Sequence, residues 1–330
     1  MATREPGANL EGRDLRLEDL SGANLKGAIL RGVDLREVRL KETILTGADL
    51  RGARLDGAEV VSAGLRSADL RGASLDGASF LECDLAIADF RDVRAQCLRF
   101  TACEMTQTDF AGSVLQKVVM EGVNAARVVL AGSRLVSCRV IGSVLVGASA
   151  VETAWDDGEI LESDLSRLDA RGLALKEMNL RSVGFRLADL SGAVFSRGSA
   201  VDVSFERCSL TGMRAEKVEA ARCGFEFADL RGAVLTDCRL SGANLVGARL
   251  AQARAVGCDL RNVDLYWAEL DGFASPNSIM IGARMPRATV CRYVPRQAPC
   301  PVVPEQGSHR TSAGPNERPS LISRVRESQG

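Results

Sequence analysis

The 330-residue chain is almost neutral, because 42 Lys and Arg balance 43 Asp and Glu, and aromatic residues make up only 4% of it. The opening segment MATREPGANLEGRDLRLEDL contains no apolar run, and charged residues interrupt the Leu-rich sequence that follows. We therefore expect no secretory signal and no transmembrane segment.

From Leu10 to Leu270 a large apolar residue recurs at every fifth position, and about forty of roughly fifty-three such positions hold Leu or Phe. An amphipathic helix repeats its apolar face near 3.6 residues and a half-buried strand near 2, so neither explains this spacing. Small residues such as Ala68 lie two positions earlier, with polar residues such as Asp69 between the two columns. A small, a polar and a large residue predict a minimal strand, and the remaining two residues suffice for a corner.

This unit, A-D/N-L-x-x, resembles the motif of the pentapeptide-repeat family, and it appears here as GANLKGA, GADLRGA, SADLRGA, LADLSGA, FADLRGA and GANLVGA. The resemblance covers residues 10 to about 272. It implies an all-β fold, a right-handed parallel β-helix of square cross-section with four pentapeptides per turn. We expect an N-terminal cap at residues 1–9 and a β-helix at residues 10–274, with about 13 coils at a rise of about 4.8 Å.

A twenty-residue period supports four units per coil, because equivalent corners then stack on one another. At the second position after the large apolar residue, one series is glycine except at Asp92, Glu152 and Gln252. Its glycines are Gly12, Gly32, Gly52, Gly72, Gly112, Gly132, Gly172, Gly192, Gly212, Gly232 and Gly272. We expect this one corner to need a positive φ.

A charge ladder is predicted beside that corner. Arginines recur every twenty residues from Arg31 to Arg91, and aspartates recur at the same period from Asp49 to Asp109. Stacked coils about 4.8 Å apart would align them as alternating charges.

The sequence changes character after Leu270. From about residue 275 the five-residue period is lost and most of the prolines gather, so we expect residues 275–330 to form a cap remnant, reaching to about 294, and a flexible tail. Residues 276–330 carry eight Lys and Arg against three Asp and Glu. Because the net charge of the whole chain is −1, the preceding solenoid has a net charge of about −6.

Seven cysteines fall in the small inward column, where we interpret them as buried residues of alanine size. They are Cys83, Cys103, Cys138, Cys208, Cys223, Cys238 and Cys258. Two pairs, twenty residues apart, could stack as a disulfide or a metal site, but this is the weaker alternative because no His joins them and no C-x-x-C is present. Free cysteines favour a cytoplasmic protein.

The sequence gives little support for catalysis. Its only histidine, His309, lies in the predicted tail, a poor place to hold catalytic geometry. In the acidic cluster WDDGE, residues 155–159, Asp157 and Glu159 point outward by register, and the cluster does not resemble a calcium or magnesium loop. We expect no enzymatic activity, no catalytic residue, no cofactor and no metal.

Two non-enzymatic functions remain. In the first, the solenoid is a scaffold that binds another protein. The alternative follows from the quinolone-resistance members of the family, rod-shaped DNA mimics that occupy the DNA groove of gyrase. B-DNA carries one negative charge per about 1.7 Å, whereas about −6 along roughly 60 Å is several-fold more dilute, so gyrase is the runner-up partner. We expect no direct nucleic-acid binding, since no basic face with interleaved aromatics appears, and no membrane binding.

We expect a protein partner, or a second copy of the chain in a homodimer, to dock on one outward column. This column contains Val61, Leu81, Ile141, Leu161 and Val201, all at multiples of twenty residues from one another. Contiguous apolar surface tends to mark an interaction site. The alternative is that β-branched residues simply suit strands and that single exposed apolar side chains have no function.

Overall fold

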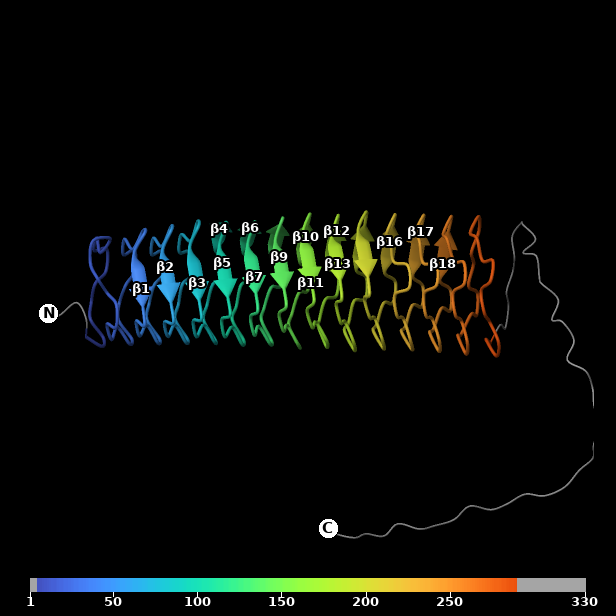
Figure 1. The fold of residues 1–330 in the computed structure, drawn as a ribbon, viewed down its shortest axis with the longest axis horizontal. Helices are drawn as coiled ribbons and strands as arrows, with labels where there is room; N and C mark the ends of the chain where they lie inside the picture. Colours follow the sequence, from blue (N-terminus) through green and yellow to red (C-terminus); the bar gives the residue numbers. More distant parts are fainter. Residues whose placement is uncertain (1–4, 290–330) are drawn as a thin grey trace, which may run out of the picture. The chain divides into compact units, whose positions relative to one another are not determined.

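The computed structural model describes residues 5–289, which wind into a stack of coils without any helix. Residues pair in parallel with the residue twenty positions further along the chain, as Asp69 does with Asp89. The Leu70 N–H donates to the Asp89 carbonyl at 2.8 Å, and the Asp89 N–H donates back to the Ala68 carbonyl at 2.9 Å. Figure 1 shows the coils following one another along a single axis. The predicted all-β parallel β-helix is confirmed.

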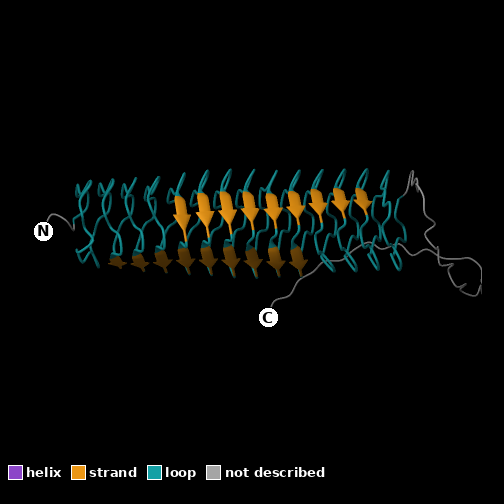
Figure 2. Cartoon of the chain, turned by 90° about the horizontal axis from the view of Figure 1, so that it is seen from above, coloured by secondary structure: helices purple, strands orange, loops and turns teal. Residues whose placement is uncertain are grey.

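Three-residue strands form on two of the four sides of the coils, and Figure 2 shows them as two rows. One nine-stranded parallel sheet contains β1 (Arg39–Lys41), β2 (Glu59–Val61), β3 (Ser79–Leu81), β5 (Arg99–Thr101), β7 (Val119–Glu121), β9 (Arg139–Ile141), β11 (Glu159–Leu161), β13 (Asn179–Arg181) and β15 (Ser199–Val201). The other contains β4 (Arg94–Gln96), β6 (Val114–Gln116), β8 (Arg134–Val136), β10 (Ala154–Asp156), β12 (Ala174–Lys176), β14 (Val194–Ser196), β16 (Arg214–Glu216), β17 (Val234–Thr236) and β18 (Arg254–Val256). The remaining two sides pair mainly through single bridges.

The large apolar residues of the five-residue period fill the lumen of the coils and form the hydrophobic core. Leu70 and Leu190 are fully buried, as the alternation of inward and outward positions predicts. Where phenylalanine replaces leucine, rings stack from coil to coil. The centroids of Phe80 and Phe100 lie 5.3 Å apart, and those of Phe90 and Phe110 lie 4.8 Å apart. The lumen is therefore a packed interior along this part of the column.

The small inward column holds alanine, cysteine and some hydroxyl residues. The seven cysteines assigned to it are all buried and free, as expected. Thr43 and Thr108 are buried there too, and each hydroxyl donates a 3.0 Å hydrogen bond to a backbone carbonyl, of Leu20 and Leu85 respectively. A buried hydroxyl is tolerated when it is hydrogen-bonded in this way.

Positive φ occurs at all four corners of the coil, so the expectation of one such corner was too narrow. In a single coil φ is 59° at Ser67, 65° at Gly72, 70° at Gly77 and 55° at Glu82. Glycine adopts this conformation without steric penalty, whereas other residues lose some stability in it. The glycine-rich series thus marks the corner where glycine is used most, while the other corners adopt the same backbone with polar residues.

The twenty-residue pairing continues past residue 274, because Ile279 pairs with Asp259 and Thr289 pairs with Glu269. Separately, the number of coils differs slightly from the expected value of about 13. The boundaries between cap, β-helix and tail remain predictions. Residues 1–4 and 290–330, including most of the predicted tail and His309, lie outside the described residues.

Candidate interaction surfaces

The acidic cluster at residues 155–159 is held in local polar contacts. Asp157 accepts a 3.0 Å hydrogen bond from the Ser137 hydroxyl, and Glu159 forms a 2.8 Å ion pair with Arg139 on the preceding coil. Among residues 5–289, no group of three or more His, Cys, Asp or Glu side chains is arranged to hold a metal ion. These carboxylates serve as polar contacts between coils, through a hydrogen bond at Asp157 and an ion pair at Glu159.

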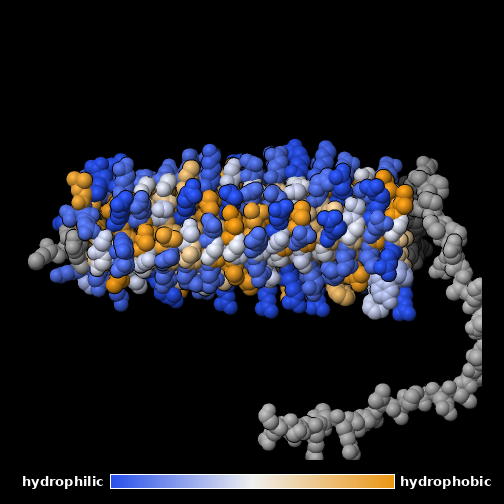
Figure 3. Space-filling model, in the orientation of Figure 1, coloured by the Kyte–Doolittle hydropathy of each residue, from blue (hydrophilic) through white to orange (hydrophobic). Residues whose placement is uncertain are grey.

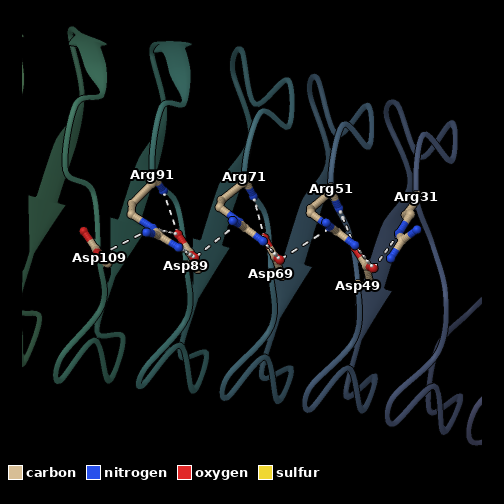
Figure 4. A network of polar contacts seen from close by, with 8 residues as sticks. All are labelled: Arg31, Asp49, Arg51, Asp69, Arg71, Asp89, Arg91 and Asp109. Carbon is tan, nitrogen blue, oxygen red and sulfur yellow. Dashed lines mark hydrogen bonds and ion pairs between the residues drawn. The ribbon is translucent and has the colours of Figure 1, made fainter.

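The predicted charge ladder is confirmed, and Figure 4 shows it running along one side of the column. Arg51 contacts Asp49 of its own coil at 2.7 Å and Asp69 of the next coil at 3.5 Å. Arg71 repeats the arrangement, at 2.7 Å from Asp69 and 3.4 Å from Asp89. Each arginine thus bridges two coils, and the two signs of charge alternate along the ladder.

Hydrogen bonding in the ladder shifts the acidity of its members. The hydrogen bonds from Arg51 hold the pKa of Asp49 well below its usual range, and those from Arg71 lower the pKa of Asp69. The carboxylates remain ionised throughout the neutral range. Because the arginines are partly exposed, each pair contributes little stability.

The structure brings together some of the column predicted for partner docking. Ile141 of β9 is the direct parallel neighbour of Leu161 of β11, and Val61 of β2 is the neighbour of Leu81 of β3. Leu81 and Val201 are exposed, whereas Val61, Ile141 and Leu161 are half-buried.

Polar residues divide this column into three short patches. Thr101 and Glu121 separate Leu81 from Ile141, and Arg181 of β13 separates Leu161 from Val201. Each apolar patch in this column is therefore at most two residues long. The pair Ile141–Leu161 is the patch at the middle of the column.

A second apolar surface lies on one corner of the column. Leu187, Phe227 and Trp267 are spaced by forty residues, so they occupy the same corner on every second coil. Their side chains are 41%, 50% and 51% exposed, and their φ angles are 62°, 57° and 60°. We call these three residues the apolar corner. Each holds a bulky apolar side chain in solvent on a left-handed backbone.

Neighbouring side chains support the rings of the apolar corner. The guanidinium carbon of Arg207, one coil before Phe227, lies 5.7 Å from the centroid of its ring. Tyr266 and Trp267 lie side by side with their ring centroids 4.6 Å apart. The aromatic residues Phe227 and Trp267 are thus in contact with neighbouring side chains while about half of their surface stays exposed.

The comparison with protein families accords with this geometry. The family described as Pentapeptide repeats matches eight copies, in overlapping segments over residues 7–96 and again over residues 238–273. These segments are pentapeptide repeats. Between the matched segments the chain keeps the same twenty-residue pairing through degenerate repeats.

Solved structures with a similar fold include other pentapeptide-repeat proteins. HetL, a pentapeptide repeat protein involved in heterocyst differentiation regulation from the cyanobacterium Nostoc sp. strain PCC 7120, is 21% identical, over 70% of this chain and 86% of its own, with a TM-score of 0.33. QnrB1, a plasmid-mediated fluoroquinolone resistance protein, is 16% identical, over 64% of this chain and 90% of its own, with a TM-score of 0.33. Rfr23 from the cyanobacterium Cyanothece 51142 is 23% identical, over 29% of this chain and 63% of its own, with a TM-score of 0.22. No curated protein matches the sequence.

Sequence reasoning missed the apolar corner, although a signal for it exists. In this pentapeptide-repeat chain the second position after the large apolar residue holds Gly or a polar residue on most coils, so Leu187, Phe227 and Trp267 depart from the pattern. A search for apolar residues at corner positions would have found them. Separately, none of the described residues forms a helix with the length and apolar character needed to cross a membrane.

Proposed function

We propose that this pentapeptide-repeat chain is a non-enzymatic scaffold that binds a protein partner through the outer surface of its coils. The apolar corner is the observation that supports the proposal. A left-handed backbone is unfavourable for bulky residues, yet Leu187, Phe227 and Trp267 adopt it while leaving 41% to 51% of their surface exposed. Glycine or a polar residue forms the same corner on the other coils except at Ile87, which is also exposed and has a φ of 61°. Strained residues that the fold does not require point to a function in recognition.

The chemistry of this corner suits a protein partner. Trp, Tyr and Arg are the residues most enriched among those that dominate binding energy in protein interfaces, and all three gather around Phe227 and Trp267. Figure 3 shows apolar patches separated by polar side chains over the visible face of the column. A small apolar centre with a polar rim is the usual anatomy of a protein interface.

The Ile141–Leu161 pair is the second proposed docking surface, for a partner protein or for a second copy of the chain. The two side chains are adjacent on β9 and β11 and are surrounded by Glu121 and Arg181 in the same column. A paired apolar contact with charges at both ends favours one register of docking over others.

The charge ladder weighs against the DNA-mimic alternative and gyrase as partner. DNA presents a continuous run of unneutralised negative charge, whereas ladder aspartates such as Asp49 and Asp69 are each paired with arginine. A gyrase supercoiling assay separates the two proposals, because a DNA mimic inhibits the enzyme and a scaffold for another partner does not. A cytoplasmic location also remains a prediction.

The scaffold proposal is tested by capturing a partner, identifying it by mass spectrometry and reconstituting the complex from purified proteins. We expect the double variant Phe227→Ser with Trp267→Ser to weaken the reconstituted complex at least about tenfold, as loss of central aromatic contacts does elsewhere. Ile141→Asp with Leu161→Asp tests the second surface, and Arg71→Ala on the ladder is the control. Unchanged affinity and unchanged mass in both double variants, with the fold intact by circular dichroism, would refute docking on either surface.

A further inference from the structure

The lumen contains an apolar cavity where three neighbouring interior positions hold alanine. Ala200, Ala215 and Ala220 occupy places of the five-residue period that hold Leu or Phe on most coils. A cavity of about 70 Å³ lies among them, in contrast to the packed lumen around Phe80 and Phe100. The space left by the missing side chains is not refilled by their neighbours.

The walls of the cavity are almost entirely apolar. Rings of Phe195, Phe205 and Phe225 and the side chains of Met178 and Met213 line it. The polar exceptions among the lining residues are Ser196 and Ser199, and none of the lining residues is charged. A charged or strongly polar guest would lose its hydration there without gaining hydrogen bonds.

Several inward residues beside this cavity are slightly exposed to solvent. Phe195 is 8% exposed, Ala220 is 7% exposed and Val218 is 9% exposed, whereas Leu70 in the packed region is completely buried. Leu235 on β17 is only half-buried. The regular sheet that starts at β1 also ends with β15, beyond which Ser199 pairs with Glu219 through a single bridge. These features place a route to solvent next to the cavity.

We propose that this cavity is a binding site for a small uncharged apolar molecule, admitted through the side of the coils next to β15. An apolar cavity of about 150 Å³ in another protein stays dry and binds benzene or xenon, so a cavity about half as large suits xenon or a hydrocarbon smaller than benzene. Binding of this kind is independent of the protein docking proposed above, because the ligand occupies the lumen and the partner occupies the outer surface.

The methionines of the full-length chain provide a direct test, with xenon as the probe. Met178, Met213 and Met280 line the cavity, and Met178 and Met213 are used as reporters, whereas Met105 and Met120 are buried in the lumen away from it. With ¹³C-methyl-labelled methionine, xenon under pressure should shift the Met178 and Met213 resonances saturably and leave those of Met105 and Met120 unchanged. Ligand binding to the folded state should also raise the melting temperature as xenon pressure rises.

Filling the cavity is the matched control. Ala220→Leu should abolish the xenon-induced shifts and keep or raise the melting temperature, because the new side chain occupies the empty space. The same change at Ala125, which is completely buried and does not line the cavity, should lower the melting temperature by overpacking. If Ala220→Leu fails to fold, Ala215→Leu takes its place. Absence of shifts at Met178 and Met213, shifts of equal size at the two control methionines Met105 and Met120, or shifts that persist in the filled variant would each overturn the proposal.

Discussion

The ring of Phe227 lies against Gly247, the corner residue of the next coil. A Cβ atom at position 247 would come within 2.6 Å of ring atoms Cδ1 and Cε1 of Phe227. Side chains rarely approach a Cβ this closely, so glycine at 247 makes room for the aromatic ring. The position of one exposed ring is therefore set by the absence of a side chain one coil away.

Replacing Gly247 with alanine should destabilise the protein through this contact. Gly232 is a matched control, because its φ of 66° is close to the 65° of Gly247. Unlike at Gly247, no atom lies within 4 Å of a Cβ built at Gly232. We expect Gly247→Ala to lower the free energy of unfolding by about 1 kcal/mol more than Gly232→Ala, the usual size of coupling between touching residues. The excess should vanish in a Phe227→Ala background. An equal loss at both glycines in denaturant titrations would contradict the contact.

Inward and outward positions should respond differently to truncation. Leu70 is fully buried, so Leu70→Ala should lower the free energy of unfolding by about 2 to 5 kcal/mol, because neighbouring coils fixed by the backbone ladder cannot collapse into the gap. The adjacent Arg71 forms ion pairs that are partly exposed to solvent, and Arg71→Ala should cost less than about 1 kcal/mol. Comparable losses in chemical denaturation would show that the side assignments are wrong.

The charge ladder should make stability fall in acid. Hydrogen bonding to Arg51 and Arg71 lowers the folded-state pKa of Asp49 and Asp69 below the unfolded value of about 3.9. Their contribution is therefore present above that pH and is lost as the pH falls below it toward the folded pKa. We expect the melting temperature to fall below pH 4, and to fall less in Arg51→Met. Added salt should shrink the difference between the two proteins at pH 6.

Replacing Trp155 with leucine should change the stability of the protein only slightly. Its Nε1 is buried and has no hydrogen-bond partner among the residues that the structure describes, and a Cβ on Gly158 would lie 2.9 Å from it. Trp155→Leu restores the residue most common at this period and removes an unsatisfied donor, which offsets the lost apolar area. We expect the melting temperature to change by no more than a few degrees. A loss as large as that of Leu70→Ala would show that the indole ring is required.

The backbone path could be predicted because two periods constrain it at once. The five-residue period assigns Ala68 and Leu70 to the interior and Asp69 to the surface, and the twenty-residue period then decides which residues touch between coils. The contact between Arg71 and Asp89 in the charge ladder could be predicted from these two periods alone. Both predictions depend on chain geometry rather than on details of packing.

Packing and strain were harder to predict from sequence. Glycine at one corner suggested positive φ there, but Ser67 and Glu82 adopt the same backbone without glycine, so composition under-reports the conformation. Alanine at 215 or 220 resembles an ordinary substitution in the repeat, and only the three-dimensional surroundings show that no neighbour fills the space. Exposure of Phe227 likewise depends on where its ring can lie over the next coil.

Because each residue pairs with the one twenty positions ahead, a whole coil of twenty residues can be deleted or inserted without changing the pairing of the others. Removing residues 51–70 would join Leu50 to Arg71, which would then stand two residues after Asp49, as Arg51 does now, and the arrangement would continue uninterrupted. Removing only residues 51–55 would instead rotate everything that follows by a quarter turn and place each subsequent face above a different one. Such a protein can change its length during evolution by gaining or losing whole coils, because only whole coils keep each side of the column aligned along its length.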